Sequence, residues 1–322
     1  MKLLEVKNLK MYYQISQGVV KAVDDVSFEI EKGEAVGLVG ESACGKTSTA
    51  MTIMKLLPPN ARIVGGQILF KGEDLVPKSD LEMRRIRWKG ISMIFQAAMN
   101  ALNPVHRVGD QVLEAILSHQ EISQAEAEKR VEELYHLVGM DPALAKGYPH
   151  EYSGGMKQRA VIAMALACNP DLIIADEPTT ALDVIVQDQI LREMTSLQKR
   201  LGMTMIYISH DISVIAETCN RIGVMYGGKL VEYADSNILF ESPRHPYTQG
   251  LFASYPSLTG EVKKLRPIPG EPPNLLSPPS GCRFHPRCPL RDDICEKEEP
   301  AYEVVAERHY VACHFARGVK KE

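Results

Sequence analysis

The sequence predicts an α/β protein with a mixed central sheet, an antiparallel β-region at its start and a helical insertion in its middle. Three patterns carry this prediction. Polar and apolar residues alternate over residues 3–30, short apolar runs alternate with a helical segment over residues 171–208, and residues 97–160 have mostly helical spacing. These are the patterns of antiparallel strands, of a parallel α/β sheet and of a helical subdomain, respectively.

The expected elements are separated by turn and stop residues, such as the Gly-rich turn after residue 39 and the prolines after residue 57. We expect strands over residues 3–13, 21–30, 34–39, 66–70, 91–95, 171–176, 203–208, 221–225 and 229–232, and helices over 47–57, 81–88, 123–138 and 186–200. In the helix over 123–138 the apolar face consists of Ala127, Val131, Leu134, Leu137 and Val138. Gly139 follows where helices tend to end.

Composition excludes several classes of protein. The 322 residues include 37 Lys+Arg and 41 Asp+Glu, a net charge of −4, which argues against a strongly basic nucleic-acid binder. The longest apolar stretch, residues 160–168, is far shorter than the ~20 residues that span a bilayer, and charges interrupt any signal-peptide core, so we expect a cytoplasmic chain. Seven cysteines, an odd number, favour metal binding or free thiols over disulfides.

A phosphate-binding loop is the strongest motif. Residues 40–47 fit G-x-x-x-x-G-K-[ST] between a predicted strand and a predicted helix. Lys46 is expected to reach the outer phosphates of a nucleoside triphosphate and the Thr47 hydroxyl to ligate Mg²⁺. The full ATP-binding set is Gly40, Glu41, Ser42, Ala43, Cys44, Gly45, Lys46, Thr47 and Ser48. Ala43 stands where many such loops carry Gly, and a positive φ there costs ~1 kcal/mol or more.

Two adjacent carboxylates stand at the end of a predicted buried strand. Asp176 suits an indirect contact with Mg²⁺, through one of the ligands of the ion or through water, and Glu177 can orient or deprotonate the water that attacks the γ-phosphate. The alternative is an acidic strand cap. His210 closes the next strand, where its ring can bond the γ-phosphate, the alternative being a structural histidine.

Residues 152–159 (YSGGMKQR) resemble the signature sequence of ATP-binding-cassette (ABC) ATPases. With them come Gln96, which looks like the Q-loop of that family, the run Ala181-Leu182-Asp183, which looks like its D-loop, and His210 as its switch histidine. The resemblance covers roughly residues 1–255 and implies an ABC-type P-loop ATPase fold, with a Pro-rich linker and Cys-containing region over 256–322. Departures are Ala43 and Met156, where many members have Gly and Gln.

The resemblance also implies a mechanism that needs two cassettes. The signature residues Ser153, Gly154, Gly155 and Met156 are expected to contact ATP held by Lys46 of the opposite cassette, and Asp183 to lie at their interface. Gln96 is expected to contact Mg²⁺ or the water and to relay the state of the site to the helical insertion. The alternative for Ser153 is a plain helix N-cap.

Adenine needs an aromatic platform. Tyr12 and Tyr13 are the candidates, on opposite faces of their strand, and the family pattern favours Tyr13. The alternative is that either tyrosine only packs on the β-region.

Within the family, the chain looks most like the ATP-binding subunits of bacterial dipeptide and oligopeptide importers. The residues that carry this resemblance are the runs Asp176–Val184, Met99–Val105, His245–Thr248 and Gly281–Pro289. It implies a second cassette, identical or different, two membrane-spanning permease subunits, an extracytoplasmic peptide-binding protein, no nucleic acid, and a place on the cytoplasmic face of the membrane. A soluble ABC ATPase acting on ribosomes or DNA is the alternative. A P-loop kinase would not explain Ser153-Gly154-Gly155.

Four cysteines in the C-terminal tail suggest a metal-binding site. Residues 267–279 contain six prolines, and beyond them Cys282, Cys288, Cys295 and Cys313 are spaced C-x5-C-x6-C-x17-C. Resemblance to importer tails favours a 4Fe–4S cluster, with zinc, or reduced or disulfide-forming cysteines, as alternatives. His285, His309 and His314 are possible substitute ligands. Cys44, Cys168 and Cys219 look like small buried hydrophobes, although Cys44 lies in the phosphate loop.

Overall fold

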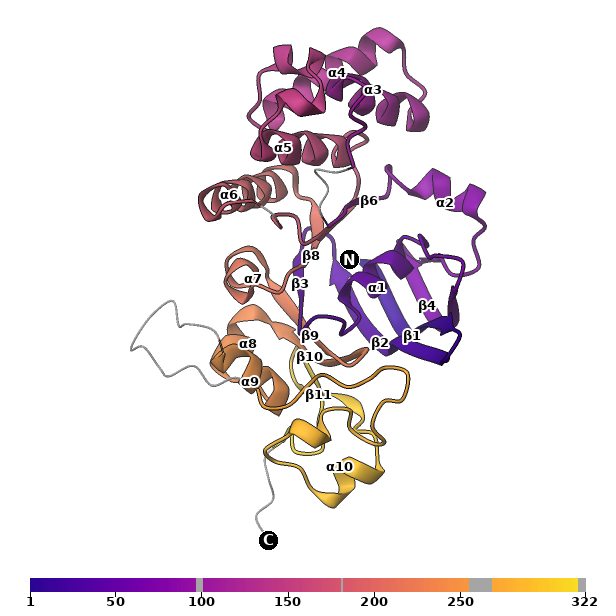
Figure 1. Ribbon diagram of the computed structural model, residues 1–322, viewed down its shortest axis with the longest axis vertical. Helices are drawn as coiled ribbons and strands as arrows, with labels where there is room; N and C mark the ends of the chain where they lie inside the picture. The colour runs from indigo at the N-terminus through magenta and orange to yellow at the C-terminus, as the bar shows by residue number, and fades with distance from the viewer. Residues whose placement is uncertain (97–100, 181, 255–267, 318–322) are drawn as a thin grey trace. The chain divides into compact units, whose positions relative to one another are not determined.

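The computed structural model describes residues 1–96, 101–180, 182–254 and 268–317. It contains two compact units: the first unit is Met1–Pro77 with Ile208–Glu322, and the second unit is Lys78–Tyr207. Figure 1 labels the helices and strands of both. Three sequence expectations fall partly outside the described residues, namely Met99 and Asn100 of the importer motif, Ala181 of the D-loop, and residues 256–267 of the linker.

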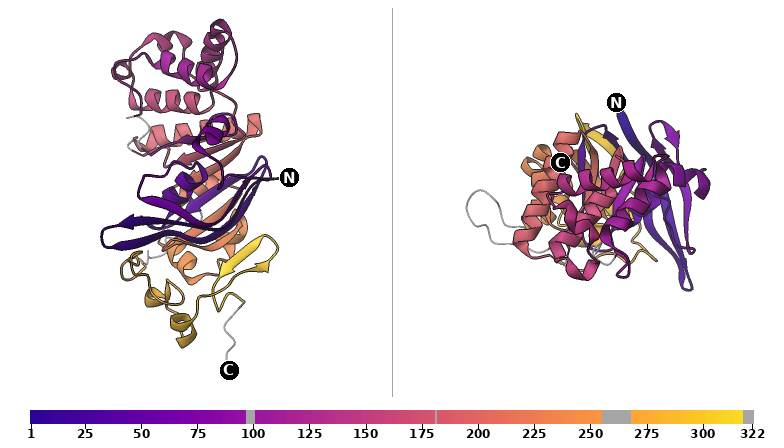
Figure 2. Two further views of the ribbon diagram at one scale, coloured as in Figure 1. Left: turned by 90° about the vertical axis from the view of Figure 1, so that its right-hand side faces the viewer. Right: turned by 90° about the horizontal axis from the view of Figure 1, so that it is seen from above.

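The first unit contains a four-stranded antiparallel sheet, seen as long indigo and violet ribbons in Figure 2. Its strands are β1 (Lys2–Ile15), β2 (Gly18–Glu31), β4 (Ala61–Phe70) and β5 (Glu73–Asp74), in the order β2-β1-β4-β5. The buried positions of β1 alternate along the strand and slip at Asn8, whose φ of 48° accompanies a shift in register. The predicted antiparallel β-region is confirmed.

The first unit also holds strands of a second, mixed sheet, in the order β11-β12-β10-β9-β3. These strands are β3 (Ala35–Val39), β9 (Arg221–Tyr226), β10 (Lys229–Asp235), β11 (Tyr302–Ala306) and β12 (His309–Ala312). β3 and β9 run parallel, whereas the other pairs are antiparallel. Both β3 and β9 are buried throughout, as expected for strands covered on two faces.

The C-terminal tail is built into this sheet, which the sequence did not predict. β12 pairs with β10, so that Val311 lies opposite Glu232 and Tyr310 opposite Tyr233. The β11–β12 hairpin is the yellow ribbon of Figure 2. On it the rings of Tyr302 and Tyr310 stack with centroids 5.7 Å apart. The tail is therefore folded onto the first unit through backbone pairing as well as side chains.

Short helices complete the first unit. They are α1 (Lys46–Ile53), α7 (Ile212–Thr218), α8 (Ser236–Glu241), α9 (Pro246–Ala253) and α10 (Asp293–Lys297), with the 3-10 turn η4 (His285–Arg287). α1 ends before residue 57, where the prolines were expected to stop it. The reason is local: Lys55 has a φ of 48°, in the left-handed region that a helix cannot continue through.

In the second unit, parallel strands alternate with helices. The strands are β6 (Ile91–Ile94), β7 (Leu172–Asp176) and β8 (Thr204–Ile208), in the order β8-β7-β6. The helices are α2 (Asp80–Ile86), α3 (Val108–His119), α4 (Gln124–Leu137), α5 (Gly154–Ala165) and α6 (Val184–Leu201), with the 3-10 turns η2 (Pro142–Lys146) and η3 (Pro149–Glu151). α3, α4 and α5 pack against one another (Figure 1). No helix in the described ranges is long and apolar enough to cross a membrane.

Helix α4 confirms the helix predicted over 123–138. Ser123 and Glu126 form a capping box, in which the Ser123 hydroxyl accepts the Glu126 N–H and the Glu126 carboxylate accepts the Ser123 N–H. Ala127, Val131 and Leu134 are buried as predicted, whereas Leu137 is half-buried. Gly139 ends the helix with a φ of 68°.

Candidate functional site

The phosphate loop joins β3 to α1 in the first unit and depends on two glycines. Gly40 has a φ of 147° and Gly45 a φ of 107°. A Cβ at Gly40 would lie 2.2 Å from the Met225 carbonyl oxygen, and one at Gly45 would lie 2.3 Å from the Ala22 carbonyl oxygen. Only glycine satisfies both the backbone angle and the space. Ala43 has a φ of 63°, so the strain considered from the sequence is present.

Lys46 lies inside this loop. Its side chain is buried, and its ammonium donates to the Gly40 carbonyl at 2.7 Å and to the Glu41 carbonyl at 3.1 Å. Thr47 follows on the exposed side of the first turn of α1. The loop therefore gathers an ammonium group, a hydroxyl and a helix N-terminus, the set that binds phosphate and Mg²⁺.

The two candidate adenine platforms point to different partners. Tyr13 shares a hydrogen bond of 3.2 Å with Ser48 of α1, next to the phosphate loop. Tyr12 instead donates its hydroxyl to Asp24 at 2.6 Å. Burial and the Asp24 carboxylate raise the pKa of Tyr12 above its ordinary value, so the phenol stays protonated. Of the two, Tyr13 lies beside the residues expected to bind ATP.

His210 also belongs to the first unit. The preceding residue, Ser209, donates its backbone N–H to the Leu38 carbonyl of β3 at 3.4 Å. This bond holds Ser209 beside Leu38 of β3, two residues before the phosphate loop begins. The His210 side chain is exposed. His210 thus follows a residue that is bonded to the strand leading into the phosphate loop.

In the second unit, the structure brings together two residues predicted separately. The Gln96 side-chain amide donates to Glu177 Oε2 at 2.8 Å, and the Thr180 hydroxyl donates to the same oxygen at 3.1 Å. β6 and β7 run parallel with Ile94 beside Ala175, so the residues that follow them emerge at one edge. Asp176 is the buried last residue of β7, and Glu177 has a φ of 47°.

The signature residues begin a helix. Ser153 is the N-cap of α5, and its hydroxyl accepts the Met156 N–H at 3.3 Å. Gly154 and Gly155 form the first turn, with backbone N–H groups directed along the helix start. The N-cap geometry and an anion-binding role are compatible, because the amides of the first turn and the Ser153 hydroxyl share one end of the helix.

Asp183 begins the next helix in the same manner. Its carboxylate accepts the Val186 N–H at 3.0 Å, so it is the N-cap of α6. Immediately after it, Val184 and Ile185 are 79% and 81% exposed. Two adjacent exposed branched hydrophobes are unusual on a free surface and suit a contact with another chain.

The four tail cysteines lie in one region of the first unit without forming a metal site. The Cys282 N–H donates to the Cys295 carbonyl at 2.8 Å, and the other thiols are close enough for their charges to affect the pKa of Cys282. Burial raises that pKa to about 12 and the pKa of Cys313 to about 11, so both thiols are neutral. Among the described residues, no three Cys, His, Asp or Glu side chains are arranged to hold a metal ion. The expected 4Fe–4S cluster, and zinc as its alternative, are thus not supported by the geometry.

The three histidines considered as substitute ligands are bonded elsewhere. His285 pairs with the Cys282 carbonyl at 3.0 Å, and His314 with the Glu298 carbonyl at 3.0 Å. His309 is buried and its Nε2 lies 2.7 Å from Glu232. The structure therefore does not show these three histidines as substitute metal ligands, although they lie near the cysteines in sequence.

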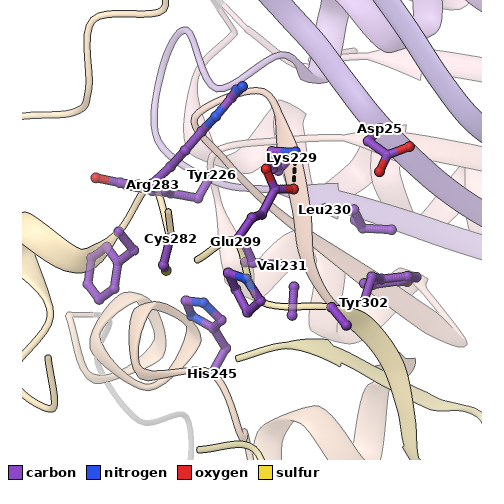
Figure 3. Close-up of a pocket in the computed structure, with 14 residues that line it drawn as sticks. Asp25, Tyr226, Lys229, Leu230, Val231, His245, Cys282, Arg283, Glu299 and Tyr302 are labelled. Carbon is purple, nitrogen blue, oxygen red and sulfur yellow. Dashed lines mark hydrogen bonds and ion pairs between the residues drawn. The ribbon is translucent and has the colours of Figure 1, made fainter. Parts of the chain in front are cut away.

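Reasoning from the sequence missed the role of two arginines, which join the tail to the region of the phosphate loop. Arg287 pairs with Glu41 of the phosphate loop, and Arg283 pairs with Asp24. A pocket of about 200 Å³ lies beside Arg283, lined also by Tyr226, Cys282 and the Lys229–Glu299 ion pair (Figure 3). The one available signal was the position of both arginines between two cysteines, in the run Cys282–Cys288.

Comparisons with known proteins identify the family of the chain. Residues 23–180 match the family model for ABC transporter, and residues 231–295 match that for the oligopeptide/dipeptide transporter C-terminal region. The chain is 49% identical to the dipeptide transport ATP-binding protein DppD of Bacillus subtilis, over 97% of this chain and 94% of that protein. It is 45% identical to the oligopeptide transport ATP-binding protein OppD of Escherichia coli, over 94% of this chain and 90% of that protein.

A solved structure supports the same assignment. The dimeric post-hydrolysis structure of the ATP-binding cassette MJ0796, bound to ADP and Pi, matches with a TM-score of 0.64 and 28% identity, over 72% of this chain and 98% of that chain. With the phosphate loop, the signature helix and the tail in place, the chain belongs to the ABC transporter family and carries the oligopeptide/dipeptide transporter C-terminal region.

Proposed function

We propose that this chain is the ATP-hydrolysing subunit that powers import of dipeptides or oligopeptides across the cytoplasmic membrane. The observation that carries the ATPase part is the phosphate loop closed around Lys46 by two glycines that no other residue can replace. The peptide part rests on similarity along almost the whole chain to dipeptide and oligopeptide transport ATP-binding proteins.

Residues of the first unit bind the phosphates and the adenine of ATP. Backbone N–H groups of the phosphate loop and of the start of α1, together with the Lys46 ammonium, hold the β- and γ-phosphates, and Tyr13 stacks on adenine. Thr47 and Asp176 supply hard oxygen ligands for Mg²⁺, with Gln96 as a further oxygen donor. When bound, Mg²⁺ neutralises charge that develops on the phosphates during transfer.

Glu177 acts as the general base of hydrolysis, and His210 donates a hydrogen bond to the γ-phosphate. Gln96 and Thr180 both donate to Glu177 Oε2, and the carboxylate takes the proton of the attacking water. The two donors also orient the carboxylate. Gln96 thus has a positioning role in addition to its expected contact with Mg²⁺ or water.

A second cassette completes the site. Ser153, Gly154, Gly155 and Met156 at the start of α5 bind the ATP held by Lys46 of the opposing cassette, and Asp183 lies at the interface. The exposed Val184 and Ile185 support this arrangement, because a partner surface would bury them. The second cassette is another copy of this chain or a sister chain.

Transport requires partners that cross the membrane. ATP-driven closure of two cassettes moves two permease subunits, to which an extracytoplasmic binding protein delivers peptide, and the chain acts from the cytoplasmic face. The alternative, a soluble ATPase acting on ribosomes or DNA, finds no support among the relatives described above.

A metal held by the four tail thiols is a separate proposal, and the arrangement of the thiols does not favour it. Its basis is the spacing C-x5-C-x6-C-x17-C and the resemblance to importer tails. No step of ATP hydrolysis depends on it. Metal analysis after anaerobic purification decides: about four irons per chain indicates a cluster, one zinc indicates the alternative, and metal-free folded protein rejects both.

Reconstitution in liposomes with the co-purified permease subunits tests the proposed function. We expect peptide uptake that requires ATP and stops when Glu177→Gln replaces the wild-type chain. ATP hydrolysis without uptake of any di- or oligopeptide, or purification with ribosomes or DNA in place of permease subunits, would contradict it.

A further inference from the structure

We propose that Arg287 of the C-terminal tail is a positioning residue for ATP, which holds the phosphate loop in its binding shape through Glu41. The proposal rests on the ATPase function proposed above and adds a residue outside the cassette motifs. It makes the tail a working part of the nucleotide site.

The contact between the two residues is a two-pronged ion pair. Arg287 Nη1 donates to Glu41 Oε2 at 2.7 Å, and Nη2 donates to Glu41 Oε1 at 2.9 Å. The Arg287 side chain is 6% exposed and that of Glu41 25%. Parallel N–H···O bonds of this kind fix direction as well as distance, in contrast to an exposed surface pair.

The guanidinium is itself held in place. Arg287 Nε donates to the Pro269 carbonyl at 2.8 Å, and Nη1 also lies 3.3 Å from the Tyr226 hydroxyl. Because three of its nitrogens have protein acceptors, the side chain has little freedom to follow Glu41 if the loop moves. Glu41 instead is held against a fixed partner.

Glu41 in turn controls the backbone of the phosphate loop. Its N–H donates to the Tyr247 hydroxyl at 2.9 Å, and its carbonyl accepts from the Lys46 ammonium at 3.1 Å. Tyr247 is fully buried and packs on Tyr226 with ring centroids 4.5 Å apart. One residue of the loop is therefore fixed by the tail through its side chain, by α9 through its N–H, and by Lys46 through its carbonyl.

Charge gives the pair a second effect. Glu41 is a carboxylate in a loop that receives a triphosphate, and without Arg287 its negative charge would repel the phosphates. The pair removes that repulsion. Removing Arg287 should thus weaken ATP binding both by loosening the loop and by leaving an unpaired carboxylate beside the phosphates.

The tail has an independent attachment, which allows this role to be tested. Arg283 donates to Asp24 and to the Gly227 carbonyl, and β12 pairs with β10. The tail should stay docked when Arg287 is changed, so that the loss concerns the phosphate loop and not the fold.

The experiment measures MgATP affinity and the KM and kcat of ATP hydrolysis for the full chain, with thermal unfolding alongside. Arg287→Ala should raise the KM for ATP roughly tenfold, the effect of losing one charge-assisted pair, and change kcat less, because Glu177 and Gln96 lie in the other unit. Arg287→Ala with Glu41→Gln should recover only part of the lost affinity, since the unpaired charge is gone but the loop is still not held. Arg287→Lys, which keeps the charge without the fork, should fall between wild type and Arg287→Ala.

Arg317→Ala is the matched control, because Arg317 pairs with Glu303 on the exposed face of the tail. Unchanged KM in Arg287→Ala, an equal rise in Arg317→Ala, or complete recovery in the double variant, which has no pair to hold the loop, would overturn the proposal. If Arg287→Ala does not fold, the Lys variant alone decides: wild-type KM overturns the proposal. Wild-type protein that neither binds nor hydrolyses ATP would instead refute the proposed function, so the two failures are distinguishable.

Discussion

Gln96 and Glu177, 81 residues apart in sequence, meet through a hydrogen bond of 2.8 Å from the Gln96 amide to Glu177 Oε2. The contact arises because β6 and β7 are parallel neighbours, so the segments that follow the two strands begin at the same edge of the sheet. It gives the carboxylate a fixed orientation at the edge where β6 and β7 end. A base that is held in this way loses less entropy when it takes up a proton from water.

Replacing Gln96 tests this orientation. Gln96→Ala should lower kcat for ATP hydrolysis roughly ten- to hundredfold, the range typical of a misplaced general base, and leave nucleotide affinity closer to wild type. Steady-state kinetics and equilibrium binding separate the two effects. Wild-type kcat in this variant would show that the Glu177 carboxylate does not depend on Gln96 for its orientation.

The phosphate loop should not tolerate a side chain at Gly45. In Gly45→Ala the new Cβ would lie 2.3 Å from the Ala22 carbonyl oxygen, on a backbone with a φ of 107°. ATP binding should be lost, and the free energy of unfolding should fall by about 3 kcal/mol or more. Nucleotide binding and chemical denaturation provide the measurements.

Gly72→Ala is the control for backbone strain alone. Gly72 has a φ of 84°, but a Cβ there meets nothing within 4 Å. Gly72→Ala should lower the free energy of unfolding by about 1 kcal/mol and leave ATP binding intact. Equal effects of the two variants would mean that the close approach at Gly45 is not what matters.

Alkylation should spare the phosphate loop. Cys44 and Cys168 are buried and have pKa values raised by burial, and burial raises that of Cys219 to about 12. Burial raises the pKa of Cys288 and Cys313 as well, so access to the thiol decides the order of labelling. N-ethylmaleimide at pH 8 should therefore label these two partly exposed thiols before any of the three buried ones. Peptide mass spectrometry reads the order, and denatured protein, which should label at every cysteine, is the reference. Early loss of ATP binding together with labelling at Cys44 would contradict the buried position of that thiol.

Acid should destabilise the first unit through His245. Its Nδ1 accepts the Tyr247 N–H at 3.0 Å, so the ring must be neutral there, and burial lowers its pKa to about 4 from 6.5. The unfolded chain takes up a proton near pH 6.5 that the folded chain refuses until near pH 4, so stability is full above this window and falls within it. We expect a loss of about 2 kcal/mol between pH 7 and pH 5.

His245→Asn is the matched variant, because an Asn side chain accepts the same N–H without titrating. Its stability should be flatter between pH 7 and pH 5 than that of wild type. Glu232 faces His245, and its own pKa is lowered by its bonds to His309 and to neighbouring backbone N–H groups, so its contribution is lost only at lower pH. Parallel pH curves for the two proteins would assign the acid sensitivity to other groups.

Local chemistry accounts for what the sequence could predict. Ser123 and Glu126 mark the start of α4 and Gly139 its end, and the order strand, glycine loop, helix around Lys46 follows from residues that are adjacent in the chain. Capping, periodicity and glycine turns act over a few residues, so they can be read without the fold.

Long-range contacts account for what it could not. Arg287 and Glu41 are 246 residues apart, and no periodicity in the sequence connects them. The addition of β12 to β10 is likewise set by tertiary pairing. The tail cysteines also depend on tertiary arrangement: their spacing and the resemblance to importer tails favoured a metal, whereas no three Cys, His, Asp or Glu side chains of the described residues are arranged to hold one.

The variant Glu177→Gln tests most directly whether two cassettes share ATP. The variant is incubated with MgATP, alone and after co-expression with its permease subunits, and both the bound nucleotide and the mass of the particle that holds it are measured. We predict intact ATP retained in a particle with two cassettes, either two copies of this chain or this chain with a sister, and loss of that particle when Ser153 is also replaced by Arg. Formation of ADP at the wild-type rate, or ATP held by a single cassette, would contradict the account.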